Sequence, residues 1–183
     1  MLVYKISGAL ADQGASLDEV YHAAEWVASN VGTIGVGLDH CHVCPHLTDQ
    51  SLARGYLNHK KQVPGTAPAS SHLKESEIEI GLGIHNENGH HRLSTIPPLY
   101  KLVPPLLEML TSTSDPERSF LPFKGSDEVV LLVNNLGGVS ELEIGGIVQE
   151  VHKALLAKGI TVRRLLSGTF MVGNETLGSR KLT

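Results

Sequence analysis

The sequence is poor in aromatic residues and in cysteine, and it carries no strong charge of either sign. Aromatic side chains make up 4% of the 183 residues, which argues against a platform on which nucleic-acid bases stack. The formal net charge of −4 argues against a basic nucleic-acid-binding surface. The two cysteines, Cys41 and Cys44, provide no disulfide framework and favour a reducing compartment. We therefore expect no nucleic acid among the partners.

Long hydrophobic runs are also lacking. The longest apolar run covers residues 129–133, whereas a membrane-spanning helix requires about 18 such residues. Lys5 lies inside an apolar stretch, while a secretory signal peptide begins with its positive charge. The sequence thus predicts no membrane partner and a cytoplasmic protein. With 41% hydrophobic residues, it holds enough apolar material for the core of one domain.

Apolar periodicity predicts alternating helices and strands. The predicted helices span residues 2–13, 16–31, 94–111 and 140–158, and the predicted strands span residues 33–38, 78–84, 128–134 and 160–166. Two of the helices begin at capping boxes, which pair Ser16 with Glu19 and Ser140 with Glu143. The strand at 128–134 reads as buried because it is rich in Val and Leu.

Glycine and proline mark further boundaries. Gly32 and Gly159 stand where left-handed residues end helices. The prolines at 97–98 belong near a helix start, and those at 104–105 predict a kink or a split. Residues 128–166 read as a strand, a helix and a strand, so we expect a parallel pair with a right-handed crossover.

These elements predict an α/β fold, a mixed sheet with flanking helices. Residues 1–38 are expected to form a helical hairpin and a first strand, and residues 39–76 a long loop or insert. Residues 77–172 are expected to form an α/β core that contains His85 and the strand–helix–strand unit. Residues 173–183 form a divergent tail.

A glycine-rich turn at residues 134–138 precedes a predicted helix. Backbone N–H groups and the helix dipole favour an anion such as phosphate at such a place. The turn lacks the Lys-Ser/Thr pair of a P-loop and a complete G-x-G-x-x-G motif. Glycines that only serve a tight turn explain it at least as well.

A cluster at residues 40–46 contains five His and Cys side chains. These are zinc ligands, but structural zinc sites usually join two separated ligand pairs, and no second cluster is evident. A loop that happens to be rich in these residues is the favoured interpretation. A small zinc-binding module remains the alternative, and we predict no metal ligand.

His85 is the sharpest single feature of the sequence. It follows a predicted strand and precedes a polar turn, the kind of place where α/β proteins put catalytic groups. A neutral imidazole there can act as acid, base, metal ligand or nucleophile, and Glu87 could orient it. Taken alone, a hydrogen-bonded turn histidine is the commoner explanation. His90 and His91 read as exposed loop residues.

Several motifs occur in the order of a known family. Residues 79–89, EIGLGIHNENG, resemble the G-x-G-I-H-[GN]-E-P-G substrate-binding segment of the dihydroxyacetone (glycerone) kinases. Residues 131–138 resemble the family's V-N-N-L-G segment, and residues 165–171 resemble the segment after it. Residues 16–38 match the part upstream. The resemblance covers most of residues 5–172, apart from the loop.

The resemblance implies an incomplete second half of the family's substrate-binding domain. It also implies ATP-dependent phosphorylation of dihydroxyacetone, with the substrate held as a covalent hemiaminal on His85. ATP and Mg²⁺ are the implied cofactors, and the family binds them on a separate helical domain that this sequence lacks. The resemblance allows a homodimer, as in the family.

The sequence also departs from the family's pattern. It lacks the glycine-rich G-G-G-S-G-H-E-P segment and a later segment with Lys and Asp, so no residue is assigned as acid or base. Asn88 replaces the usual proline, and the match fades after Met171. The alternative interpretation is therefore a non-catalytic truncated fragment without kinase activity of its own.

Overall fold

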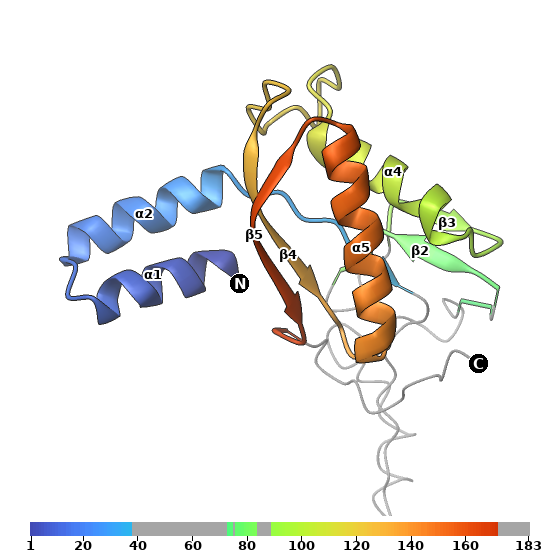
Figure 1. Ribbon diagram of the computed structural model, residues 1–183, viewed down its shortest axis with the longest axis horizontal. Coiled ribbons are helices and arrows are strands. Elements are labelled where there is room, and N and C mark those ends of the chain that lie inside the picture. Colours follow the sequence, from blue (N-terminus) through green and yellow to red (C-terminus); the bar gives the residue numbers. More distant parts are fainter. Residues whose placement is uncertain (38–72, 75, 84–88, 172–183) are drawn as a thin grey trace, which may run out of the picture. The chain divides into compact units, whose positions relative to one another are not determined.

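The computed structural model describes residues 1–37, 73–74, 76–83 and 89–171 (Figure 1). These residues fall into two compact units. Unit 1 comprises Met1–Ile34, Pro97–Asn135 and Ser140–Met171, and unit 2 contains the described parts of Gly35–Ile96 and Leu136–Val139. In the described part of the chain, no helix is long and apolar enough to cross a membrane.

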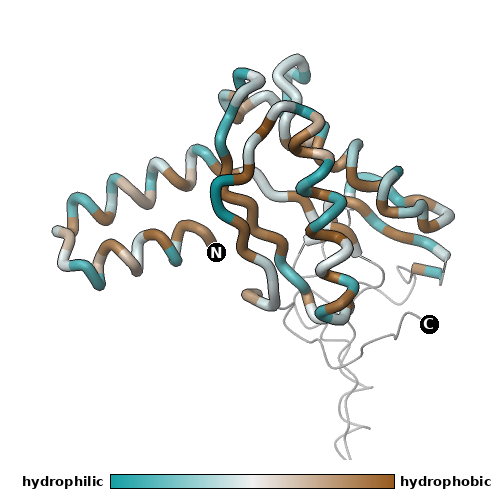
Figure 2. Tube along the Cα trace, viewed as in Figure 1, coloured by the Kyte–Doolittle hydropathy of each residue, from teal (hydrophilic) through white to brown (hydrophobic). Residues whose placement is uncertain are grey.

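Unit 1 begins with a helical hairpin of α1 (Leu2–Asp12) and α2 (Leu17–Ser29). Hydrophobic and hydrophilic residues alternate along both helices (Figure 2). The capping box of α2 forms as predicted: Glu19 Oε2 accepts from the N–H and the hydroxyl of Ser16, at 2.7 and 2.8 Å. This box fixes the start of α2 because it satisfies N–H groups that have no partner within the helix.

The prediction that Gly32 ends α2 as a left-handed residue is wrong. The helix ends at Ser29, and its C-cap is Asn30 with a φ of −120°. Gly32 is instead closely packed against side chains, because a Cβ there would lie 2.9 Å from Leu121 Cδ1 and the leucine would have to shift.

The larger part of unit 1 consists of α4 (Leu99–Thr111) and the unit β4 (Glu128–Asn134), α5 (Glu141–Ala157) and β5 (Thr161–Gly168). The strands pair in parallel, with Leu131 opposite Leu165, which confirms the predicted pairing. Gly159 follows α5 with a φ of +76°, as predicted for a left-handed residue at a helix end.

Two prolines, Pro104 and Pro105, lie inside α4, which runs unbroken from Leu99 to Thr111, so of the predicted kink or split the split does not occur. Each proline removes one N–H of the helix and leaves a carbonyl four residues earlier without its partner. Those carbonyls belong to Tyr100 and Lys101, which are exposed like the prolines themselves. Water can therefore take the place of the missing donors on this side of the helix.

The core of unit 1 lies between the helices α4 and α5 and one face of the parallel strands β4 and β5. Its buried side chains are Val103, Leu107, Leu155 and Ile160. The opposite face of β4 is open: Val130 is 47% exposed, and no residue of β4 is fully buried. The prediction of a buried strand is thus wrong, because β4 has a single neighbouring strand among the described residues.

Unit 2 contains a three-stranded antiparallel sheet in the order β1 (Val36–Gly37), β2 (Ile78–Ile80) and β3 (His91–Leu93). The two predicted strands of this region are shorter than expected, and β3 was not predicted. The central strand β2 is buried along its whole length. The α/β class is confirmed, with parallel and antiparallel pairing in separate sheets.

Candidate functional site

The structure describes both ends of the segment that carries His85. His85 itself lies outside the described residues, as do all of residues 84–88 and the cluster at 40–46. The chain leaves β2 at Gly81 and returns at Gly89, just before β3. The two ends of the segment, at Gly81 and at Gly89, are what the structure describes of this candidate site.

The first end is fixed at Gly81. Its N–H donates to the carbonyl of Gly35 at 2.7 Å, and its φ of +82° turns the chain out of the strand. This conformation favours glycine, which explains why β2 stops at Ile80 and does not continue as predicted. Leu82 then packs against the chain at Gly35 and Gly37, where a Cβ on Gly37 would overlap the leucine side chain.

The second end is fixed at Gly89 and His90. The N–H of Gly89 donates to Glu79 Oε1 at 2.8 Å, and the N–H of His90 donates to the carbonyl of Ile80 at 2.9 Å. A Cβ on Gly89 would lie 2.5 Å from the Ile80 carbonyl oxygen. Glycine is thus the residue that allows the chain to approach β2 so closely.

Glu79 is a functional candidate that the sequence reasoning did not single out. It lies in the middle of β2 and is 7% exposed. A buried carboxylate is costly unless it is hydrogen-bonded, and the Gly89 N–H supplies one such bond. The signal in the sequence was an acidic residue between two isoleucines, in a strand that reads as alternating.

The charges next to Glu79 form a small network at the start of β2. Arg92, which faces Glu79 in the strand register, donates from Nη2 to Glu77 Oε2 at 2.7 Å. The same oxygen of Glu77 accepts from the Lys74 N–H at 2.9 Å, and this bond, with Arg92, lowers the pKa of Glu77 despite some desolvation. His90 and His91 are exposed, as predicted, although His91 belongs to β3.

The turn after β4, predicted as a possible anion site, leads to a helix that already has an anionic cap. Glu143 Oε2 accepts from the N–H and the hydroxyl of Ser140, at 2.8 and 2.6 Å, which confirms the predicted capping box. These hydrogen bonds lower the pKa of Glu143. A carboxylate of the protein itself therefore lies at this helix start, which weighs against a further anion.

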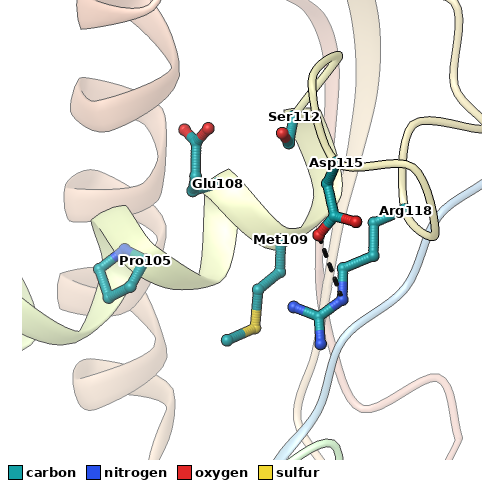
Figure 3. Close-up of a pocket in the computed structure, with 6 residues that line it drawn as sticks. All are labelled: Pro105, Glu108, Met109, Ser112, Asp115 and Arg118. Atoms are coloured by element: carbon teal, nitrogen blue, oxygen red, sulfur yellow. Dashed lines mark ion pairs between the residues drawn. The ribbon is translucent and has the colours of Figure 1, made fainter.

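A hollow of about 300 Å³ lies beside α4 in unit 1 (Figure 3). It is lined by Pro105, Glu108, Met109, Ser112, Asp115 and Arg118. Arg118 pairs with Asp115 at 3.9 Å, and Glu108 pairs with Lys158. Its charges are thus paired with each other or with a neighbour, and it brings no nucleophile to a base. Over the residues that the structure describes, no group of three His, Cys, Asp or Glu side chains could hold a metal ion.

Comparisons with known proteins identify the family. The family model of the Dak1 domain matches residues 1–58 and 44–180. The chain is 44% identical over 157 residues to a dihydroxyacetone kinase of Pichia angusta, covering 84% of this chain and 24% of that protein. It is 37% identical over 178 residues to the triokinase/FMN cyclase of Rattus norvegicus, covering 97% of this chain and 27% of that protein.

Solved structures agree with this relationship. The dihydroxyacetone kinase of C. freundii is 30% identical with a TM-score of 0.59, and the match covers 87% of this chain and 24% of that one. A dihydroxyacetone kinase operon co-activator, 24% identical with a TM-score of 0.67, shares the fold. The chain spans about a quarter of the length of the kinases that it matches. On these matches, the chain belongs to the Dak1 domain family.

Proposed function

We propose that this chain supplies the substrate-capturing segment of a dihydroxyacetone kinase, and that His85 forms a covalent hemiaminal with dihydroxyacetone. The observation that carries the proposal is that both ends of the His85 segment are anchored, one to Gly35 and the other to β2, in a chain whose relatives include dihydroxyacetone kinases. A histidine on a segment held at both ends can be presented to a small substrate with little loss of conformational freedom.

The chemistry of capture is a simple addition. A nitrogen of the neutral His85 imidazole attacks the ketone carbon, and a C–N bond forms while the carbonyl π electrons move to oxygen. That oxygen gains a proton and the second ring nitrogen loses one, so no water is released. This reaction selects a carbonyl compound over a polyol such as glycerol, which has no electrophilic carbon.

Phosphoryl transfer to a terminal hydroxyl then belongs to the whole kinase. A relative, the C. freundii kinase, has been solved in complex with AMP-PNP and Mg²⁺. We propose that ATP and Mg²⁺ bind to a part of the complete protein outside these 183 residues. For the chain alone we expect capture of the substrate without turnover.

The experiment uses dihydroxyacetone labelled with ¹³C at the carbonyl. We expect a new hemiaminal carbon signal in the NMR spectrum, and in native mass spectrometry an adduct with the mass of one whole substrate. His85→Ala should abolish both, while the matched variant His91→Ala, an exposed histidine of β3, should retain them. An adduct that survives in His85→Ala would overturn the assignment.

A non-catalytic chain is the second candidate function, because the sequence spans only about a quarter of the related kinases. Under this alternative the chain neither captures dihydroxyacetone nor transfers phosphate. Adduct formation by the wild-type chain would exclude an inert relic. Measurable ATP-dependent phosphorylation by the chain alone would contradict both the alternative and our expectation of capture without turnover.

A further inference from the structure

We propose that Glu79 is a positioning residue, whose buried carboxylate holds the returning end of the His85 segment in the geometry that substrate capture requires. This inference rests on the proposed function and deepens it. Glu79 is six residues before His85 in the sequence and is described by the structure together with its partner Gly89.

The burial of Glu79 is the first argument. A carboxylate that is only 7% exposed in the central strand of a sheet is expensive compared with an apolar residue at the same place. Ile78 and Ile80 point to the opposite face of the strand, and all three residues of β2 are buried, so the face that carries Glu79 is shielded from solvent as well. The carboxylate is explained by what it binds, and Gly89 is one partner.

The geometry of the anchor is the second argument. Gly89 N donates to Glu79 Oε1 at 2.8 Å, and a Cβ on Gly89 would lie 2.6 Å from Glu79 Cγ. The glycine therefore rests directly on the side chain that binds it. A hydrogen bond to a carboxylate is about twice as strong as one between neutral groups, so this bond is well suited to hold backbone in place.

The position of the anchor along the chain is the third argument. The segment leaves β2 from Gly81, whose N–H is held by the Gly35 carbonyl, and it returns to Glu79 and Ile80 of the same strand. Only residues 82–88 separate the two anchored glycines. A short segment with both ends fixed has far fewer conformations than one fixed at a single end, so less conformational entropy is lost when it binds a small substrate.

The test compares four proteins by their dissociation constant for dihydroxyacetone, measured from the ¹³C hemiaminal signal. Glu79→Gln keeps the shape but weakens the acceptor, and we expect roughly a tenfold weaker adduct; Glu79→Ala should weaken it further. The matched control is Glu77→Gln. The Glu77 carboxylate accepts from Lys74 N and Arg92 Nη2, so this variant should bind dihydroxyacetone like the wild type.

A second readout separates positioning from general loss of structure. The Gly89 N–H should exchange faster with solvent in Glu79→Gln, while the N–H groups of β2 and β3 keep their protection. Gly89→Ala displaces the same end with Glu79 intact, and it should weaken the adduct to a similar degree. If Glu79→Gln binds dihydroxyacetone with the same dissociation constant as the wild type, this inference is overturned and the proposed function is not. If Glu79→Gln loses the adduct and the N–H groups throughout β2 and β3 also lose their protection, Glu79 serves the fold as a whole, and that result would overturn the inference as well. A wild-type chain without any adduct would overturn the proposed function, and this inference with it.

Discussion

The side chain of Asn134 makes two hydrogen bonds with the backbone of Met171, donating one and accepting the other. Nδ2 donates to the Met171 carbonyl at 2.6 Å, and the Met171 N–H donates to Oδ1 at 2.9 Å. The Phe170 N–H donates to the same oxygen, also at 2.9 Å. The carboxamide thus takes the place of a peptide group in a neighbouring strand, and it ties the chain beyond β5 to the end of β4.

We predict that Asn134→Ala lowers the free energy of unfolding by roughly 1–2 kcal/mol, because three hydrogen bonds at a partly exposed site are lost. Asn134→Asp should be destabilised at neutral pH, where a carboxylate oxygen faces the Met171 carbonyl, and should recover at acid pH, where a protonated oxygen can donate. Urea unfolding at both pH values measures this. The control Asn30→Ala, which removes one exposed bond to the Trp26 carbonyl, should cost less.

The capping box of α5 predicts an acid-dependent loss of stability. The Ser140 hydroxyl, and next its N–H, lower the pKa of Glu143 from its ordinary value of 4.5. The stabilisation is therefore complete above that value and is lost as the pH falls through the lowered pKa of the folded state. Glu143→Gln should be less stable than the wild type near neutral pH, and the difference should shrink at about pH 3.

The double variant Ser140→Ala/Glu143→Gln tests whether that loss belongs to the box. In a double-mutant cycle, the coupling between the two residues should be present at neutral pH and decline in acid, because the serine hydroxyl is the largest cause of the lowered pKa. A coupling that is equal at both pH values would contradict the prediction.

Two glycines with left-handed backbone provide a matched pair. Gly159 has a φ of +76°, and a Cβ there would lie 2.6 Å from the Gly125 carbonyl oxygen. Gly14 has a φ of +82° with nothing within 4 Å of such a Cβ. Gly14→Ala should cost about 1–2 kcal/mol for the conformation alone, and Gly159→Ala should cost clearly more. Equal thermal midpoints for the two variants would argue against close packing at Gly159.

The exposed glycines of α5 predict a gain in stability. A Cβ on Gly145 or Gly146 would meet no atom within 4 Å, and both residues lie inside the helix. Replacing either by alanine removes backbone freedom from the unfolded chain, so each should stabilise the protein by about 0.5–1 kcal/mol in chemical denaturation. A loss of stability would mean that this face of α5 is in contact with other atoms.

Features set by neighbours in sequence were predictable. Both capping boxes and the bounds of β4 agree with the structure, because a serine and a glutamate three residues apart carry the cap within themselves. The resemblance of the segment 79–89 to a kinase motif was equally local, and it led to the family that the comparisons identify.

Features set by tertiary contacts were not predictable. The carboxylate of Glu79 is hydrogen-bonded by Gly89, and the close packing at Gly32 involves Leu121, which is distant in sequence. The exposure of Val130 reflects a strand with one neighbour, which a run of Val and Leu does not reveal. The polar strand β3 lacks the hydrophobic pattern by which strands are recognised, because two of its three residues are exposed.

The sheet of unit 2 has a consequence for the order of folding. The pairing of β2 with β3 joins residues that are close in the chain, whereas β1 pairs with β2 across roughly forty residues. Closing the longer loop costs more entropy, so β2 and β3 should form a hairpin nucleus before β1 docks. The Glu79–Gly89 bond belongs to the early step and the Gly35–Gly81 bond to the late one. The two ends of the His85 segment should therefore be secured at different stages of folding, and the end at Gly81 should be the first to open when the protein unfolds.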